Sequence, residues 1–85
     1  MPLVTVYTRA FCPYCSFALE LLQRKGAPVT LIDATGDPGK RQEMIDRSGR
    51  RTFPQIFVGE THVGGCDDLH ALDRRGGLDS LLQGA

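Results

Sequence analysis

The sequence lacks any long hydrophobic run and any excess of charge of one sign. No stretch approaches the roughly 18 apolar residues of a membrane-spanning helix, and no basic segment followed by an apolar one marks a secretory leader. Ten basic and ten acidic residues leave no net charge, which disfavours a broad surface for nucleic acid. We therefore expect a cytoplasmic protein that binds neither membranes nor nucleic acids.

Cysteine is also scarce. The chain has three cysteines, an odd number that does not suit a framework of structural disulfides. In a reducing compartment, a Cys-x-x-Cys pair is more often redox-active or metal-binding than a permanent crosslink. The chain has 85 residues, 41% of them hydrophobic, and no repeat or low-complexity linker. We expect residues 1–85 to form one monomeric domain.

The segment Phe11-Cys12-Pro13-Tyr14-Cys15 carries two of these thiols. Pro13 suits the first position of a helix, which makes Cys12 the N-cap residue. The positive end of the helix then favours the thiolate of Cys12, whereas Cys15 lies inside the first turn. Positions three apart on a helix also bring two Cα atoms within disulfide range. The spacing predicts a reactive pair, with Cys12 as the nucleophile and Cys15 as the resolving thiol.

A structural zinc site is the alternative interpretation. His62 and Cys66 could complete four ligands with Cys12 and Cys15. However, 46 residues separate Cys15 from His62, whereas the connecting loops of such sites usually have about 12 to 20. This spacing favours a redox pair without a metal.

Hydrophobic patterning predicts an α/β fold with the order β-α-β-α-β-β-α. The first half reads as a strand, a helix and a parallel strand joined by a right-handed crossover. The second half reads as a helix, a hairpin and a third helix, followed by one docked turn. The expected strands are Leu3–Thr8, Val29–Ile32, Gln55–Val58 and Thr61–Val63. The first expected helix starts at Pro13, and the other two cover Pro38–Ser48 and Asp67–Arg75. The final docked turn is Leu78–Leu82.

On the first helix, the apolar face is expected to contain Cys15, Ala18, Leu19 and Leu22 and to be widened by Phe17 and Leu21. Gly26 is the expected stop.

Three motifs together resemble the dithiol glutaredoxin family, most closely its bacterial glutaredoxin 3 type. They are Cys12-Pro13-Tyr14-Cys15, Thr52-Phe53-Pro54 and Gly64-Gly65-Cys66-Asp67-Asp68. The resemblance covers nearly the whole chain. It implies a thioredoxin-like fold, with a four-stranded mixed sheet flanked by three helices, and glutathione-dependent reduction of protein disulfides and of glutathione mixed disulfides.

The resemblance also implies a cis peptide before Pro54, next to the thiols. The main-chain groups of Phe53 would then pair with an extended substrate, assisted by Thr52. The family usually has a smaller β-branched residue where Phe53 stands, which affects side-chain packing but leaves the main-chain contact unchanged.

Glutathione offers two carboxylates and one ammonium group, and the resemblance implies a partner for each. Gly65 would allow close approach to the N–H groups of Cys66 and Asp67, which would bind the γ-glutamyl carboxylate, while the Asp67 side chain would pair with the ammonium group. Arg9 and Arg41 would bind the glycyl carboxylate.

Five further residues near these motifs have simpler expected roles. Tyr14 would pack at the rim of the sulfurs, and Cys66 is expected to be a structural thiol. Asp68 could cap the helix, bind glutathione or do both. Arg50 and Arg51 are expected to be solvated.

We therefore predict a glutathione-dependent thiol-disulfide oxidoreductase that acts on disulfide-containing or glutathionylated proteins and uses glutathione as cosubstrate. Two related functions are alternatives. A glutaredoxin-like reductant served by thioredoxin reductase normally lacks the Gly-Gly-Cys-Asp stretch, and a monothiol iron-sulfur module would lack Cys15.

Overall fold

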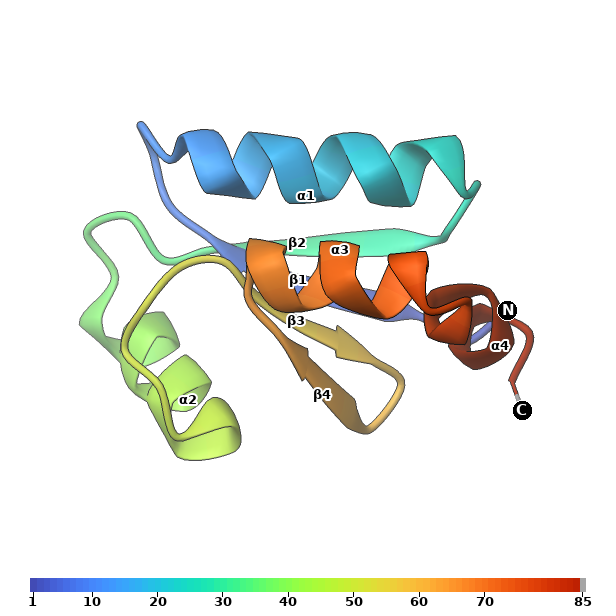
Figure 1. The fold of residues 1–85 in the computed structure, drawn as a ribbon. Coiled ribbons are helices and arrows are strands. Elements are labelled where there is room, and N and C mark those ends of the chain that lie inside the picture. Colours follow the sequence, from blue (N-terminus) through green and yellow to red (C-terminus); the bar gives the residue numbers. More distant parts are fainter. Residues whose placement is uncertain (85) are drawn as a thin grey trace.

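The computed structural model describes residues 1–84 as a four-stranded mixed sheet with helices on both faces (Figure 1). In space the strands follow the order β2-β1-β3-β4. Strand β1 pairs parallel with β2 and antiparallel with β3, and β3 pairs antiparallel with β4. The bounds are β1 Val4–Thr8, β2 Val29–Asp33, β3 Gln55–Val58 and β4 Thr61–Gly64. The mixed sheet and the element order predicted from the sequence are confirmed.

Within residues 1–84, four helices accompany the sheet, one more than expected. Their bounds are α1 Pro13–Arg24, α2 Pro38–Ser48, α3 Cys66–Arg74 and α4 Gly77–Leu82. The segment expected to be a docked turn is the short helix α4, which buries Leu78 and Leu82. Helix α3 begins and ends one residue earlier than predicted, because Gly65 takes the N-cap position.

The two faces of the sheet carry separate cores. Helices α1, α3 and α4 cover one face, and α2 covers the other (Figure 1). Alternate side chains of a strand point to opposite faces, so Val6 and Ile56 pack towards α1 and α3, whereas Tyr7 and Phe57 pack towards α2. Because both faces are covered, the central strands β1 and β3 are almost wholly buried.

A buried tyrosine fixes α2 against the sheet. The hydroxyl of Tyr7 donates to the carboxylate of Glu43 and accepts from Nη1 of Arg47 at 2.9 Å. Arg47 also lies over the ring of Phe57, 4.1 Å from its centroid. Burial, followed by the hydrogen bond to Glu43, raises the pKa of Tyr7, so the hydroxyl remains a donor at neutral pH. These contacts set the position of α2 relative to β1.

The apolar face of α1 is narrower than predicted. Cys15, Ala18 and Leu22 are buried as expected, but the side chain of Phe17 is 51% exposed. Phe17 lies two residues after Cys15, about 200° around the helix, and so points away from the sheet. Its ring meets Tyr14 edge-on at 6.5 Å between centroids, which gives this end of the molecule an exposed aromatic pair.

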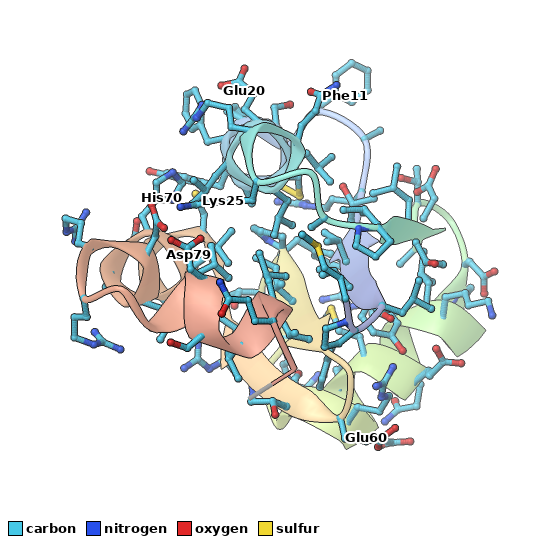
Figure 2. The ribbon with its side chains drawn as sticks, turned by 90° about the vertical axis from the view of Figure 1, so that its right-hand side faces the viewer. Phe11, Glu20, Lys25, Glu60, His70 and Asp79 are labelled. Carbon is cyan, nitrogen blue, oxygen red and sulfur yellow. A yellow bond between two sulfur atoms is a disulfide. The ribbon has the colours of Figure 1, made fainter. Side chains whose placement is uncertain are left out.

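Ion pairs join the far end of α1 to the other helices on its face. Nζ of Lys25 lies 2.8 Å from the Asp73 carboxylate and 3.0 Å from that of Asp79 (Figure 2). Within residues 1–84, no helix is both long enough and apolar enough to cross a membrane.

Candidate functional site

The two thiols of the Cys-x-x-Cys segment lie at the start of α1. Cys12 is the N-cap residue, Pro13 occupies the first turn, and the backbone N–H of Cys15 donates to Sγ of Cys12 at 3.2 Å. Cys12 and Cys15 are joined by a disulfide, and their Cα atoms are 5.3 Å apart. Cys12 is partly exposed, while Cys15 is only 3% exposed. An incoming thiolate therefore reaches the sulfur of Cys12 more readily.

The residue before the pair has an unusual conformation. Phe11 adopts φ 56°, a left-handed conformation that bulky residues seldom take, and its side chain is fully exposed. Figure 2 shows its ring pointing outward from the start of α1.

The loop between α2 and β3 supplies a binding edge. The peptide between Phe53 and Pro54 is cis, as the resemblance implied. In the described part of the chain, neither the N–H nor the C=O of Phe53 has a hydrogen-bond partner. Both main-chain groups are therefore available to an extended ligand.

A buried glutamine holds this loop in place. Gln55 is fully buried, and its Nε2 donates to the carbonyl oxygen of Thr52 at 3.0 Å and to its Oγ1 at 3.1 Å. The amide oxygen of Gln55 accepts from Nε2 of His62 at 2.8 Å. Burial lowers the pKa of His62, and the positive charge of Arg50 lowers it further. The imidazole is therefore neutral at pH 7, with its proton on Nε2.

His62 is half-buried and stacks on Phe57 with 4.8 Å between ring centroids. The sequence offered His62 as a candidate zinc ligand, and the network that it forms with Gln55 was not predicted.

The start of α3 separates the roles of two neighbouring aspartates. Oδ2 of Asp68 accepts from the backbone N–H of Gly65 at 2.9 Å and from Nη1 of Arg50 at 2.9 Å. The Gly65 hydrogen bond, followed by Arg50, holds the pKa of Asp68 below its usual range. Asp68 thus caps the helix, and Asp67 is exposed to solvent with no ion-pair partner within residues 1–84.

Gly64 is required where the chain enters α3. Its φ is 118°, and a Cβ at this position would collide with the carboxylate of Asp68. The glycine therefore allows the close approach that the Asp68 cap needs.

Two grooves flank Phe53. The first, which we call the arginine groove, has a volume of about 520 Å³ and is lined by Arg9, Ala10, Phe11, Ala34, Thr35, Gly36, Arg41, Arg51, Thr52 and Phe53. The second, the helix groove, has a volume of about 200 Å³ and is lined by Tyr14, Arg50, Thr52, Phe53, Pro54, Gly65, Cys66, Asp67 and Asp68. Phe11 lines the first and Tyr14 the second, and Cys12 borders a further hollow that it shares with Arg9 and Phe11.

The two grooves contain all the predicted binding residues. Arg9 and Arg41 share the arginine groove, and Arg9 also lies over the ring of Phe53 at 5.6 Å. Tyr14, Gly65, Cys66 and Asp67 share the helix groove with Pro54, and both grooves include Thr52 and Phe53. Arg51, expected to be a solvated charge, is exposed and lines the arginine groove. The same expectation is wrong for Arg50, because its guanidinium group pairs with Asp68.

The third cysteine, Cys66, is the first residue of α3 and lines the helix groove. Cys66 is 8% exposed, and Nδ1 of His70 lies 3.5 Å from its sulfur and 2.9 Å from its carbonyl oxygen. Burial raises the pKa of Cys66, with a smaller contribution from Asp67, which keeps the thiol protonated at neutral pH. Among residues 1–84, no group of three or more His, Cys, Asp or Glu side chains could hold a metal ion.

The following matches to known sequences share one family description. The sequence profile of the Glutaredoxin family matches residues 4–63. A Pseudomonas aeruginosa protein named Glutaredoxin is 57% identical over 96% of this chain and 98% of its own length. Glutaredoxin 3 of Escherichia coli K12 is 55% identical over 94% of this chain and 96% of its own length.

Solved structures give the same match. The solution structure of glutaredoxin from Brucella melitensis is 61% identical and has a TM-score of 0.84, covering 96% of this chain and 89% of its own. A structure described as "Metal Binding of Glutaredoxins" is 60% identical, with a TM-score of 0.73 and the same coverage.

Proposed function

Because this chain belongs to the glutaredoxin family, we propose that Cys12 is the thiol that attacks substrate disulfides and Cys15 the thiol that resolves the mixed disulfide. The chain is a glutathione-dependent thiol-disulfide oxidoreductase. The observation that carries the assignment of roles is the hydrogen bond from the N–H of Cys15 to Sγ of Cys12 at the start of α1. This bond and the helix dipole stabilise negative charge on Cys12.

The proposed reaction consists of thiol-disulfide exchanges. The thiolate of Cys12 attacks one sulfur of the substrate disulfide, forms a mixed disulfide and releases the other sulfur as a thiolate, which takes up a proton. With a protein disulfide, Cys15 attacks the Cys12 sulfur of the mixed disulfide, releases the reduced substrate and leaves the Cys12–Cys15 disulfide of the structure. One glutathione thiolate then attacks the Cys12 sulfur and releases Cys15, and a second attacks the sulfur of the bound glutathione, which releases the Cys12 thiolate and oxidised glutathione. With a glutathione mixed disulfide, Cys12 attacks the glutathione sulfur, and the same last step frees it. The stabilised Cys12 thiolate is a good leaving group in that last step.

We propose that glutathione lies across Phe53, with one end in each groove. Its main chain pairs with the N–H and C=O of Phe53, its γ-glutamyl carboxylate meets the N–H groups at the start of α3, and Asp67 pairs with its ammonium group. Arg9 and Arg41 hold the glycyl carboxylate at the other end. Support comes from the two grooves that share Thr52 and Phe53, and from the cap formed by Asp68, since within residues 1–84 the exposed carboxylate of Asp67 has no ion-pair partner.

We propose that residues 1–85 act as a monomeric domain in the reducing cytoplasm, on disulfide-containing or glutathionylated proteins, without membrane or nucleic-acid partners. The balanced charge and the single reactive thiol pair support this proposal.

Replacement of each cysteine tests the roles of the pair. Cys12→Ser should abolish reduction of both glutathione mixed disulfides and protein disulfides. Cys15→Ser should keep the first activity and lose reduction of protein disulfides that need both thiols. Initial rates on the two substrate types give the answer, and an active Cys12→Ser variant with an inactive Cys15→Ser variant would reverse the assignment.

We further propose that the reaction uses no resident metal, because every step exchanges bonds between sulfur atoms. The 60% identical structure is described as "Metal Binding of Glutaredoxins", so the metal content of this chain needs a direct measurement. Atomic absorption on protein purified without chelator should find far less than one metal ion per chain, and a chelator should leave both the rate and the melting temperature unchanged. One tightly held ion per chain, with loss of stability on chelation, would contradict the proposal.

A further inference from the structure

The sizes of the two grooves do not match the two ends of glutathione. The bulkier γ-glutamyl end would occupy the helix groove of about 200 Å³. The smallest residue of the tripeptide, glycine, would face the arginine groove of about 520 Å³. The arginine groove therefore has room for a larger group than a single glycyl carboxylate.

The charge of this groove also exceeds what one carboxylate needs. Arg9, Arg41 and Arg51 line it, and no acidic residue does. Within residues 1–84 these three arginines form no ion pair, whereas Lys25, Lys40 and Arg50 each have a carboxylate partner.

The acidic residues next to this groove are already engaged in hydrogen bonds. Asp33 accepts from the N–H of Thr35 at 2.8 Å, and Asp37 accepts from the N–H of Lys40 at 3.0 Å. A hydrogen bond from a backbone N–H leaves a carboxylate charged, and Asp37 lines a neighbouring hollow together with Arg41. The three guanidinium groups nevertheless form no ion pair within residues 1–84, and the lining of the groove itself is positive.

The direction of the bound tripeptide defines which part of a larger substrate enters this groove. In glutathione, the glycine follows the cysteine. If the glycyl carboxylate binds Arg9 and Arg41, the residues that follow the reacting cysteine of a protein substrate occupy the same groove, because both substrates pair with Phe53 in the same direction.

We propose that the arginine groove selects protein disulfides in which acidic residues follow the reacting cysteine, and that Arg51 binds the acidic side chain beyond the first position. This inference rests on the proposed function and deepens it, because it names the class of protein substrate. Guanidinium groups bind carboxylates in two-pronged pairs, which suits side chains of Asp and Glu in an open groove.

An exchange equilibrium tests this selection directly. The Cys15→Ser variant is first converted to the mixed disulfide between Cys12 and glutathione. It is then equilibrated with an end-blocked peptide that contains one cysteine followed by Asp-Glu, Asn-Gln or Lys-Lys. Each exchange makes one disulfide bond and breaks one, so no oxidant or reductant is needed. Mass spectrometry measures the ratio of peptide-bound to glutathione-bound protein.

We expect the Asp-Glu peptide to be bound about three- to tenfold more than the Asn-Gln peptide at low salt, and the Lys-Lys peptide least. The preference should shrink in 0.5 M salt, because the groove is open to solvent and salt screens exposed charges. Equal binding of the three peptides would overturn the inference.

Two arginine variants make the test specific. Arg51→Gln should lower the ratio of Asp-Glu to Asn-Gln peptide by about two- to threefold, and Arg9 and Arg41 supply the preference that is left. Arg24→Gln removes the same charge from the exposed last turn of α1, and should leave the ratio unchanged. An equal fall in both variants would point to net charge and contradict a role for the groove. If glutathione itself forms no mixed disulfide with Cys12, the proposed function fails, independently of peptide preference.

Discussion

Gln55 determines the position of the substrate-binding loop through its side chain. Its amide donates twice to Thr52 and accepts once from His62, and so uses both donor hydrogens and the oxygen. Because Thr52 directly precedes Phe53, these bonds fix the main chain that would pair with glutathione. These contacts could not be predicted from the sequence, because a lone glutamine in an apolar strand belongs to no motif that would indicate its hydrogen-bond partners.

We predict that Gln55→Leu will destabilise the protein and weaken glutathione binding. The substitution leaves the His62 N–H and the Thr52 oxygens without a partner, which should cost about 1 to 3 kcal/mol in the free energy of unfolding. The Michaelis constant for glutathione should rise several-fold with a smaller change in kcat, because the start of α1 is untouched. Urea unfolding and steady-state kinetics provide the two measurements.

The matched control is Gln42→Leu on α2. Gln42 is exposed and donates to Asp46 one turn along the same helix, so its loss should cost only a few tenths of a kcal/mol and leave the Michaelis constant unchanged. Similar effects of the two substitutions would refute the role assigned to Gln55.

At the scale of single elements, the caps made most bounds predictable. Cys12-Pro13 and Asp37-Pro38 start α1 and α2 where the sequence indicated, and the left-handed Gly49 ends α2. The start of α3 was predicted one residue late, because Gly65 has no side chain and the cap is supplied by Asp68, three residues later. The Asp68 side chain caps the helix from within its first turn, by accepting from the N–H of Gly65. Because Asp67 and Asp68 are adjacent, the sequence does not indicate which of the two is the cap.

The Asp68 cap predicts a pH-dependent contribution to stability. The folded-state pKa of Asp68 is lowered, so its contribution is fully present above the unfolded value of about 3.9 and is lost as pH falls through the folded value. Asp68→Asn should therefore cost about 1 kcal/mol at pH 7 and at pH 5, with the difference from the parent protein shrinking below pH 4. Urea unfolding at pH 7, 5 and 3 measures it.

Glu60→Gln serves as the control for this series. Glu60 lies in the exposed turn between β3 and β4 and points into solvent (Figure 2). Its substitution should change the unfolding free energy by less than about 0.5 kcal/mol at all three pH values. A cost of Asp68→Asn that stayed constant down to pH 3 would show that its charge makes no contribution.

At the scale of the whole molecule, the fold brings three separate segments to one end of the sheet. Arg9 follows β1, Arg41 lies on α2 and Asp67 on α3, yet all three line grooves that meet at Phe53. The motifs and their order were readable from the sequence. The inclusion of Arg51 in the arginine groove was not, because it depends on how the loop before β3 turns, which no local pattern specifies.

We predict that glutathione supplies the electrons through a site built from these segments. The most direct measurement is a coupled assay with a small disulfide and NADPH, supplied with either glutathione plus its reductase or thioredoxin reductase alone. We predict turnover only with glutathione, and a rise of up to about fivefold in its Michaelis constant for Asp67→Ala, since Asp67 is exposed and its pairing is worth at most about 1 kcal/mol. Efficient turnover with thioredoxin reductase, together with indifference to Asp67→Ala, would contradict the account.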